Sequence, residues 1–162
     1  MNVYGKRWRG GETFLPQVLH RKELKATNMT KRILVIGALA AGIGVAAGAF
    51  GAHGLRPILS EKMMAVFETG VRYHLVHALA MLIAGLSAHW FNHRVFVRAG
   101  WSFFAGILIF SGSLYTLALT DIRTLGMLTP FGGLAFLTGW CFLAWGYWKF
   151  PFSLAASSSK SP

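Results

Sequence analysis

Three histidines have the residue type and spacing of a metal site or a proton relay. His74 and His77 are three positions apart, which places both imidazoles on one face of a helix. His53 follows a run of small residues, and Glu68 and Thr129 add further polar side chains near the apolar segments. Neutral imidazole ligates Zn, Cu, Fe or Ni. One hypothesis is therefore a metal site built from two or three of these histidines with Glu68.

Hydrogen bonding between helices is the interpretation that the sequence favours for the same histidines. Polar side chains hold helices together inside membranes, and they also satisfy the carbonyl groups left free at helix ends. Proton-linked transport is a third possibility. The chain lacks, however, a carboxylate inside its apolar runs, which is the group that proton relays in transporters commonly use.

Four long apolar runs set the fold class. Asp, Glu, Lys and Arg are all absent from residues 33–55, 73–93, 99–120 and 124–148. Each run reaches the roughly 20 residues that a helix needs to cross the hydrocarbon of a bilayer. Because backbone groups in hydrocarbon must pair internally, these runs are predicted to be helices. The sequence therefore predicts an all-α polytopic membrane protein with four transmembrane helices, and its first partner is the lipid bilayer.

Residues 56–72, between the first two runs, are more polar. Apolar side chains recur there at steps of three and four, while Glu68 and Arg72 lie elsewhere on the helix. This pattern is typical of an amphipathic helix in the membrane interface. Glu68 precedes Arg72 by four positions, which is the favourable order for an ion pair on a helix.

Basic residues indicate how the chain is oriented. Of the 16 Lys and Arg, 12 fall on the side of the two termini, and four fall on the other side: Arg56, Lys62, Arg72 and Arg123. Since Lys and Arg in short loops stay in the cytoplasm, both termini are predicted to be cytoplasmic. The net charge of +11 is then a consequence of topology, and no nucleic-acid partner is predicted.

The chain divides into three parts. Residues 1–28 form a basic extension, residues 29–152 the four-helix transmembrane domain, and residues 153–162 a tail that is predicted to be disordered and cytoplasmic. Two interpretations of the extension stay open. It is either a tail that touches anionic lipid or a translated leader that precedes a start at Met29.

The predicted topology brings the strongest polar candidates to the extracytoplasmic end of the bundle. We therefore expect a candidate site there, made of His53, Glu68, Arg72, Tyr73, His74, His77 and Thr129. Small residues are expected to pack the helices closely, notably Gly44, Gly48, Gly51, Gly132 and Gly133. Packing within the bundle is favoured over packing between copies, and a homo-oligomer or another membrane partner remains open.

Three short stretches carry a family resemblance. They are GAFGAHGL at residues 48–55, FETGVRYH with HAL at 67–79, and TPFGG at 129–133. In this order they resemble the domain of unknown function 423, a family of small four-span bacterial membrane proteins similar to the animal transmembrane protein 256. The resemblance covers about residues 29–148. It implies a four-helix protein of the bacterial inner membrane, and it supplies no activity, substrate or catalytic residue.

The sequence leaves three functions open. A non-enzymatic accessory or scaffold protein is favoured, because Gly and Ala faces suit tight helix contacts. A transporter or channel would place Ser111, Ser113, Thr116 and His77 along its path. A metal or haem protein would use His53, His74 and His77. No catalytic residue and no cofactor is predicted, because the chain has no Walker loop, zinc CxxC pair or GxSxG motif.

Overall fold

The chain forms four antiparallel helical spans in a computed structural model that describes the backbone of residues 14–150 and the side chains of residues 28–150. The first span is α1 (Phe14–Phe50) with a π-helical turn, Gly51–Leu55, and the second is α2 (Glu61–Phe91). The third contains α3 (Arg94–Gly106), a π-helical turn (Ile107–Ser111) and α4 (Gly112–Thr120). A 3-10 turn (Arg123–Leu128) and α5 (Thr129–Lys149) make the fourth.

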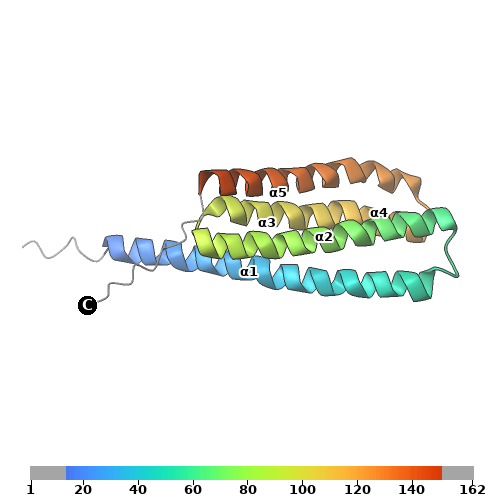
Figure 1. Ribbon diagram of the computed structural model, residues 1–162, viewed down its shortest axis with the longest axis horizontal. Coiled ribbons are helices and arrows are strands. Elements are labelled where there is room, and N and C mark those ends of the chain that lie inside the picture. Colours follow the sequence, from blue (N-terminus) through green and yellow to red (C-terminus); the bar gives the residue numbers. More distant parts are fainter. Residues whose placement is uncertain (1–13, 151–162) are drawn as a thin grey trace, which may run out of the picture.

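The predicted fold class is confirmed. Four segments of the described chain are long and apolar enough to cross a membrane, namely Asn28–Leu55, Glu61–Phe91, Arg94–Thr120 and Arg123–Lys149. The first 13 residues and the predicted tail at 153–162 lie outside the described residues. Within the predicted basic extension, the backbone from residue 14 is helical and continuous with the first span, which projects beyond the other helices (Figure 1).

Capping residues fix where the helices begin and end. Ser60 precedes α2, and its hydroxyl accepts a hydrogen bond from the Met63 N–H at 3.3 Å, as an N-cap serine should. Asn92 ends α2 with φ 46°, and Asp121 ends α4 with φ 54°. Asn and Asp tolerate this left-handed conformation better than most other residues, so both turns are encoded locally.

The polar stretch at residues 56–72 differs from the prediction of a separate interfacial helix. From Glu61 onward it is the first part of α2, which runs without a break into the apolar segment. No proline or other helix-breaking signal separates the charged part of α2 from the apolar run that begins at Tyr73, and extending a helix costs much less free energy than nucleating a second one. Gly70 does not interrupt it either. An added Cβ there would lie 2.9 Å from the Tyr115 ring, so this glycine makes room for a neighbouring helix.

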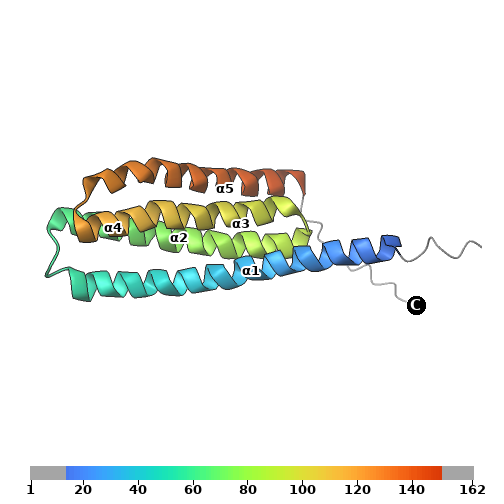
Figure 2. The same ribbon diagram turned by 180° about the vertical axis from the view of Figure 1, so that it is seen from behind.

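The spans lie side by side in the order α1, α2, third span, α5. Contacts are most extensive between α1 and α2, between α2 and the third span, and between the third span and α5. Figures 1 and 2 show α1 and α5 at opposite edges of the bundle. In the most apolar 18-residue stretch of each span, 50% of the residues are buried in α2, compared with 22% in the first span and 22% in the fourth. The second span is therefore the interior helix, and α1 and α5 are edge helices.

The third span and α5 pack by inserting phenylalanine rings against glycines. Gly132, Gly139 and Gly146 of the fourth span face Phe110, Phe103 and Phe96 in turn, and Gly106 faces Phe136 in the opposite direction. The residue number falls on one helix as it rises on the other, so all four contacts belong to one antiparallel register. On the first span, Gly44 faces Leu75, Gly48 faces Val71 and Gly51, in the π-helical turn, faces Phe67. These three glycines therefore let α1 approach α2.

Two adjacent glycines on α5 provide a matched test of this packing. At Gly132 an added Cβ would contact the Phe110 backbone nitrogen and lie 2.8 Å from the Phe110 Cα, whereas at Gly133 it would meet no atom within 4 Å. We expect Gly132→Ala to lower the free energy of unfolding by about 1–3 kcal/mol, because backbone atoms cannot move aside. Gly133→Ala should leave it unchanged or raise it, since Ala has the better helix propensity. SDS titration in mixed micelles measures both, and equal losses would refute this packing.

Candidate functional site

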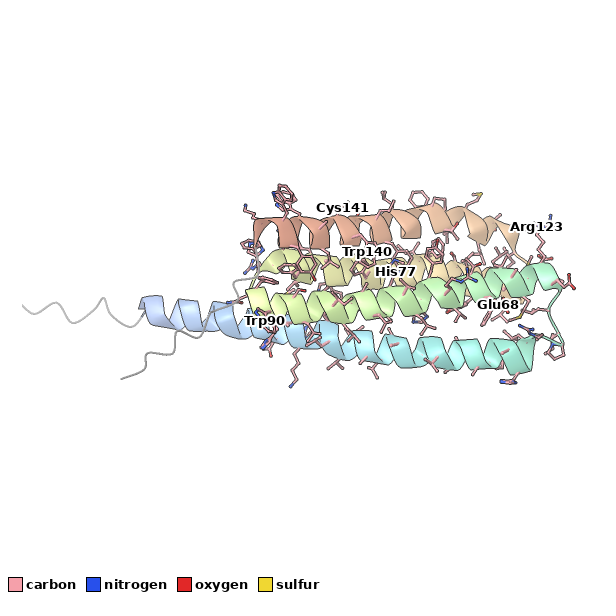
Figure 3. All side chains as sticks on the ribbon, in the orientation of Figure 1. Glu68, His77, Trp90, Arg123, Trp140 and Cys141 are labelled. Atoms are coloured by element: carbon pink, nitrogen blue, oxygen red, sulfur yellow. The ribbon has the colours of Figure 1, made fainter. Side chains whose placement is uncertain are left out.

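His74 and His77 lie midway along the bundle, not at its end. His77 is 16 residues from the start of α2 and 14 from its end. It stacks on Phe136, which is 13 residues from either end of the fourth span. Figure 3 shows His77 and Trp140 midway along the helices, with Glu68 and Arg123 near one end and Trp90 near the other. This corrects the predicted position at the extracytoplasmic end. The physical reason is that α2 begins at Glu61, well before Tyr73.

Both ring nitrogens of His77 have partners. Its Nδ1 lies 2.7 Å from the backbone carbonyl oxygen of Tyr73, and the Trp140 indole Nε1–H donates to Nε2 at 3.3 Å. A carbonyl can only accept, and an indole N–H can only donate. The geometry is therefore that of a neutral imidazole with its proton on Nδ1 and an acceptor at Nε2. The bond to Trp140 joins α2 to α5.

Aromatic rings enclose the His77 imidazole. The ring of Phe136 is parallel to it, with centroids 3.4 Å apart and an interplanar angle of 9°. Phe103 and Trp140 approach at 5.7 and 6.1 Å, and these two rings also contact each other edge to face. His77 is only 5% exposed. The imidazole is thus the polar centre of an aromatic layer contributed by three of the four spans.

His74 makes a second polar contact one turn away. Its Nδ1 lies 3.2 Å from the Tyr115 hydroxyl on α4, and the backbone carbonyl of Ala40 faces the ring from α1. His74 Nε2 is buried, and no described side chain or backbone group gives it a hydrogen bond of good geometry. His74 therefore touches both α1 and α4, but only part of its hydrogen-bonding capacity is used.

Ser111 is a second buried polar residue whose side chain has no partner in the part of the chain that the structure describes. Its side chain is fully buried, and its hydroxyl makes no hydrogen bond within the described residues. It ends the π-helical turn Ile107–Ser111 in the middle of the third span. Such turns are rare and are frequent at functional sites. Ser113 and Thr116, in contrast, donate to backbone carbonyls of their own helix, those of Phe110 and Gly112.

The other predicted site residues do not join His74 and His77. His53 is exposed in the π-helical turn that ends the first span. His74 contacts α1 near Gly44, nine residues earlier, which is about 13 Å along a helix. Thr129 donates to the carbonyl of Gly126 at 2.7 Å and so stabilises the turn before α5. Tyr73 packs its ring on Phe110, with centroids 4.6 Å apart.

Glu68 pairs with Arg56 rather than with Arg72. The Arg56 guanidinium lies 3.0 Å from the Glu68 carboxylate, and both side chains are largely exposed. Exposed ion pairs contribute about 0–1 kcal/mol, so this one chiefly ties the connection at residues 56–60 to α2. Glu68 and Arg72 both line a cavity of about 240 Å³ between α1 and α2.

The described side chains do not assemble a metal site. Among residues 28–150, no three His, Cys, Asp or Glu side chains come close enough together to hold a metal ion. His77 also lacks a free ring nitrogen, and His53 is remote from the other two histidines. The predicted set of His53, His74 and His77 is therefore not brought together by the fold.

Sequence reasoning missed the partners of these histidines. Trp140 has the residue type that marks membrane interfaces, but it donates to His77 in the middle of the bundle. One signal was available, because Trp140 lies eight residues inside the end of its apolar run, whereas Trp148 marks that end. The pairing of Tyr115 with His74 depends on how α2 and α4 are rotated, which the sequence pattern does not specify.

The arrangement is suited to holding helices together. Besides the bonds of His77 to Trp140 and of His74 to Tyr115, the Ser87 and Tyr147 hydroxyls lie 2.7 Å apart and join α2 to α5. Among residues 28–150, none of the side chains that make these bonds is a carboxylate. The chemistry of the arrangement is that of neutral hydrogen bonds and stacked rings.

Comparisons with known proteins agree on one family. A family model described as "Protein of unknown function (DUF423)" matches residues 47–133. A UPF0382 membrane protein of Staphylococcus haemolyticus is 47% identical over 120 residues, which is 74% of this chain and 98% of the relative. The UPF0382 membrane protein YwdK of Bacillus subtilis is 45% identical over 111 residues, 68% of this chain and 90% of its own length. No solved structure is significantly similar.

Removing the indole donor tests the bond between α2 and α5. Trp140→Phe keeps an aromatic ring but leaves His77 Nε2 buried without a partner. Hydrogen bonds between membrane helices are worth about 0.6 kcal/mol on average and up to about 1.7. We expect a loss of unfolding free energy in that range, measured by SDS titration. Trp148→Phe is the control, because Trp148 is 90% exposed.

A double-mutant cycle isolates the bond itself. His77→Leu and Trp140→Phe should each destabilise the protein, and the double variant should lose less than the sum of the two. Strict additivity, or an equal loss in Trp148→Phe, would mean that the two side chains are not coupled.

Proposed function

The chain belongs to the DUF423 family of membrane proteins, and we propose that it is a non-enzymatic accessory or scaffold protein of the bacterial inner membrane. It would act by packing the exposed face of α1 against a helix of another membrane protein. The observation that carries this proposal is the accessible small-residue surface on α1.

The interior of the bundle supports a structural role. His77 uses both ring nitrogens within the chain, and Ser113 and Thr116 bond to their own helix. Enzymes and proton pumps in membranes place ionisable groups where they face a cavity or a path. Among residues 28–150, the acidic side chains are Glu61, Glu68 and Asp121, all outside the apolar runs.

The outward face of α1 supports a contact with another helix. Ala38, Gly42, Ala46 and Ala49 are exposed along one side of this edge helix. An added Cβ at Gly42 would meet no atom within 4 Å, in contrast to Gly44, which faces α2. Small residues at four-residue spacing let two backbones approach closely, which is what drives association in lipid. The bundle itself leaves this side of α1 uncovered.

Photocrosslinking in native membranes tests the proposed contact. A photoreactive amino acid at Ala46 should give one discrete protein adduct, whereas the same probe at Leu137, exposed on the opposite edge helix, should give mainly lipid adducts. Gly42→Leu should reduce the Ala46 adduct by at least about tenfold, because close approach of backbones needs small residues. The stability of Gly42→Leu should be near that of the parent, since the position faces open space.

The identity of the adduct distinguishes the possible partners. A second copy of this chain would indicate a homo-oligomer, and a different protein would indicate an accessory role. Equal adducts from Ala46 and Leu137, or adducts that persist in Gly42→Leu, would contradict the proposed contact.

A small-solute transporter is the second candidate, and one observation favours it. Among residues 28–150, neither the buried His74 Nε2 nor the buried Ser111 Oγ has a hydrogen-bond partner of good geometry, and Ser111 lies in a π-helical turn. Unpaired polar atoms in the middle of a membrane bundle are costly, and a passing solute or water would satisfy them. A solute flux in proteoliposomes that Ser111→Ala abolishes would support transport over scaffolding.

We also propose that both termini face the cytoplasm, because the end of the bundle that carries them is the more basic one. Alkaline phosphatase fused after Lys149 should therefore be inactive, and the same enzyme inserted at residues 123–124 should be active, since it folds only outside the cytoplasm. The reverse pattern would invert the proposed orientation.

A further inference from the structure

Basic side chains gather at one end of the bundle. This basic end carries Lys31, Arg32, Arg94, Arg98 and Lys149, all exposed. The acidic side chains among residues 28–150 lie elsewhere: Glu61 begins α2, Glu68 pairs with Arg56, and Asp121 ends α4. These three positions are all at the opposite end of the bundle, so no carboxylate within the described side chains is placed to neutralise the basic end.

A cavity of about 300 Å³ lies within this basic end. Its walls come from α1 at Met29 and Thr30, the end of α2 and the first turns of α3. The polar lining consists of Thr30, Asn92, His93, Arg94 and Arg98, and the apolar lining of Met29, Ala88 and Val97. Thr30 is 93% buried, so the cavity extends into the bundle. Two guanidinium groups thus stand beside hydroxyl, amide and imidazole groups, over an apolar floor.

A second, smaller cavity adjoins the first. It measures about 120 Å³, lies between α3 and α5, and shares His93 and Arg98 with the larger one. Lys149 and Trp145 also line it. Arg98 therefore stands between two hollows that are both basic and partly apolar.

We propose that these cavities bind the phosphate group of an anionic phospholipid from the leaflet at the basic end, with Arg94 and Arg98 as the principal ligands. Guanidinium groups bind phosphate oxygens in a bidentate fork. Basic pockets between membrane helices are a recognised site for anionic headgroups. The apolar floor formed by Ala88 and Val97 then contacts the glycerol and the first acyl carbons.

Position favours a lipid over free phosphate as the source of this group. Trp90, Trp145 and Trp148 are all exposed near the same end of the bundle, where they form the aromatic belt that marks a membrane interface. A phosphate bound between Arg94 and Arg98 would lie at headgroup depth. The apolar side chains that line both cavities would contact the apolar part of a lipid, but they would make no favourable contact with a free anion.

Two charge-matched double variants of the full chain test the site. Arg94→Gln with Arg98→Gln removes two charges that line the cavities, and Lys31→Gln with Arg32→Gln removes two from the same end that do not. The probe is phosphatidylglycerol added to detergent-purified protein, with bound lipid counted by native mass spectrometry. We expect the first pair to weaken binding on the order of tenfold or more and the second pair to change it less than about twofold. Arg94→Lys with Arg98→Lys keeps both charges but loses the guanidinium forks, so it should bind more tightly than the Gln pair and less tightly than the parent, and it shows that the fold tolerates substitution there.

Each result supports or overturns the proposal. Equal losses in the two Gln pairs would show diffuse attraction and no site. Equal binding of phosphatidylcholine would show that the negative charge is not recognised. Inorganic phosphate that binds alone and displaces the lipid at millimolar concentration would identify a soluble anion as the ligand. Failure of the proposed accessory role would leave these measurements unaffected, because they involve no protein partner.

Discussion

Polar side chains inside a bilayer must find their hydrogen-bond partners within the protein, and in this chain that constraint falls on α2. Water is absent from hydrocarbon, so each unsatisfied polar group there is costly. His74, His77 and Ser87 all project from α2, and they reach Tyr115, Trp140 and Tyr147 on other spans. Because these bonds start from one helix, they also fix how α4 and α5 are rotated about it. The second span is therefore the reference to which the third and fourth are aligned.

Close packing of phenylalanine rings against glycines also holds the helices together. Between the third span and α5, phenylalanines face glycines in both directions, so the two backbones approach as closely as the rings allow. This interface is apolar and sits beside the aromatic layer around His77, with Phe103 and Phe136 belonging to both. Packing and hydrogen bonding thus share residues, and a change at either phenylalanine affects both. The edge helix α1, in contrast, is held to α2 largely by close approach at small residues.

Much of the fold could be predicted from the sequence, but the site could not. The four spans follow from runs without charge, since only helices of that length satisfy the backbone in lipid. The position of His74 and His77 along the bundle does not follow from the charge pattern. The apolar run begins at Tyr73, but the helix begins at Glu61, because charged residues alone do not end a helix. The partners of these histidines depend on tertiary rotation. Trp140 has the same residue type as the interfacial tryptophans, and only its position eight residues inside the run separates it from them.

The π-helical turn at Ile107–Ser111 determines which side of α4 faces the interior. Such a turn amounts to one inserted residue, and each residue advances a helix by about 100°. Were the third span α-helical throughout, Leu114 and Tyr115 would point about a quarter-turn away from Gly70 and His74, which they now contact. Deleting a single residue within this turn would therefore convert it to α-helix and leave Leu114 and Tyr115 facing Gly70 and His74. A one-residue alignment gap at this point between two related chains would mark the loss of the π-helical turn with the same interior preserved, whereas a gap elsewhere in the third span would rotate α4 by about 100°.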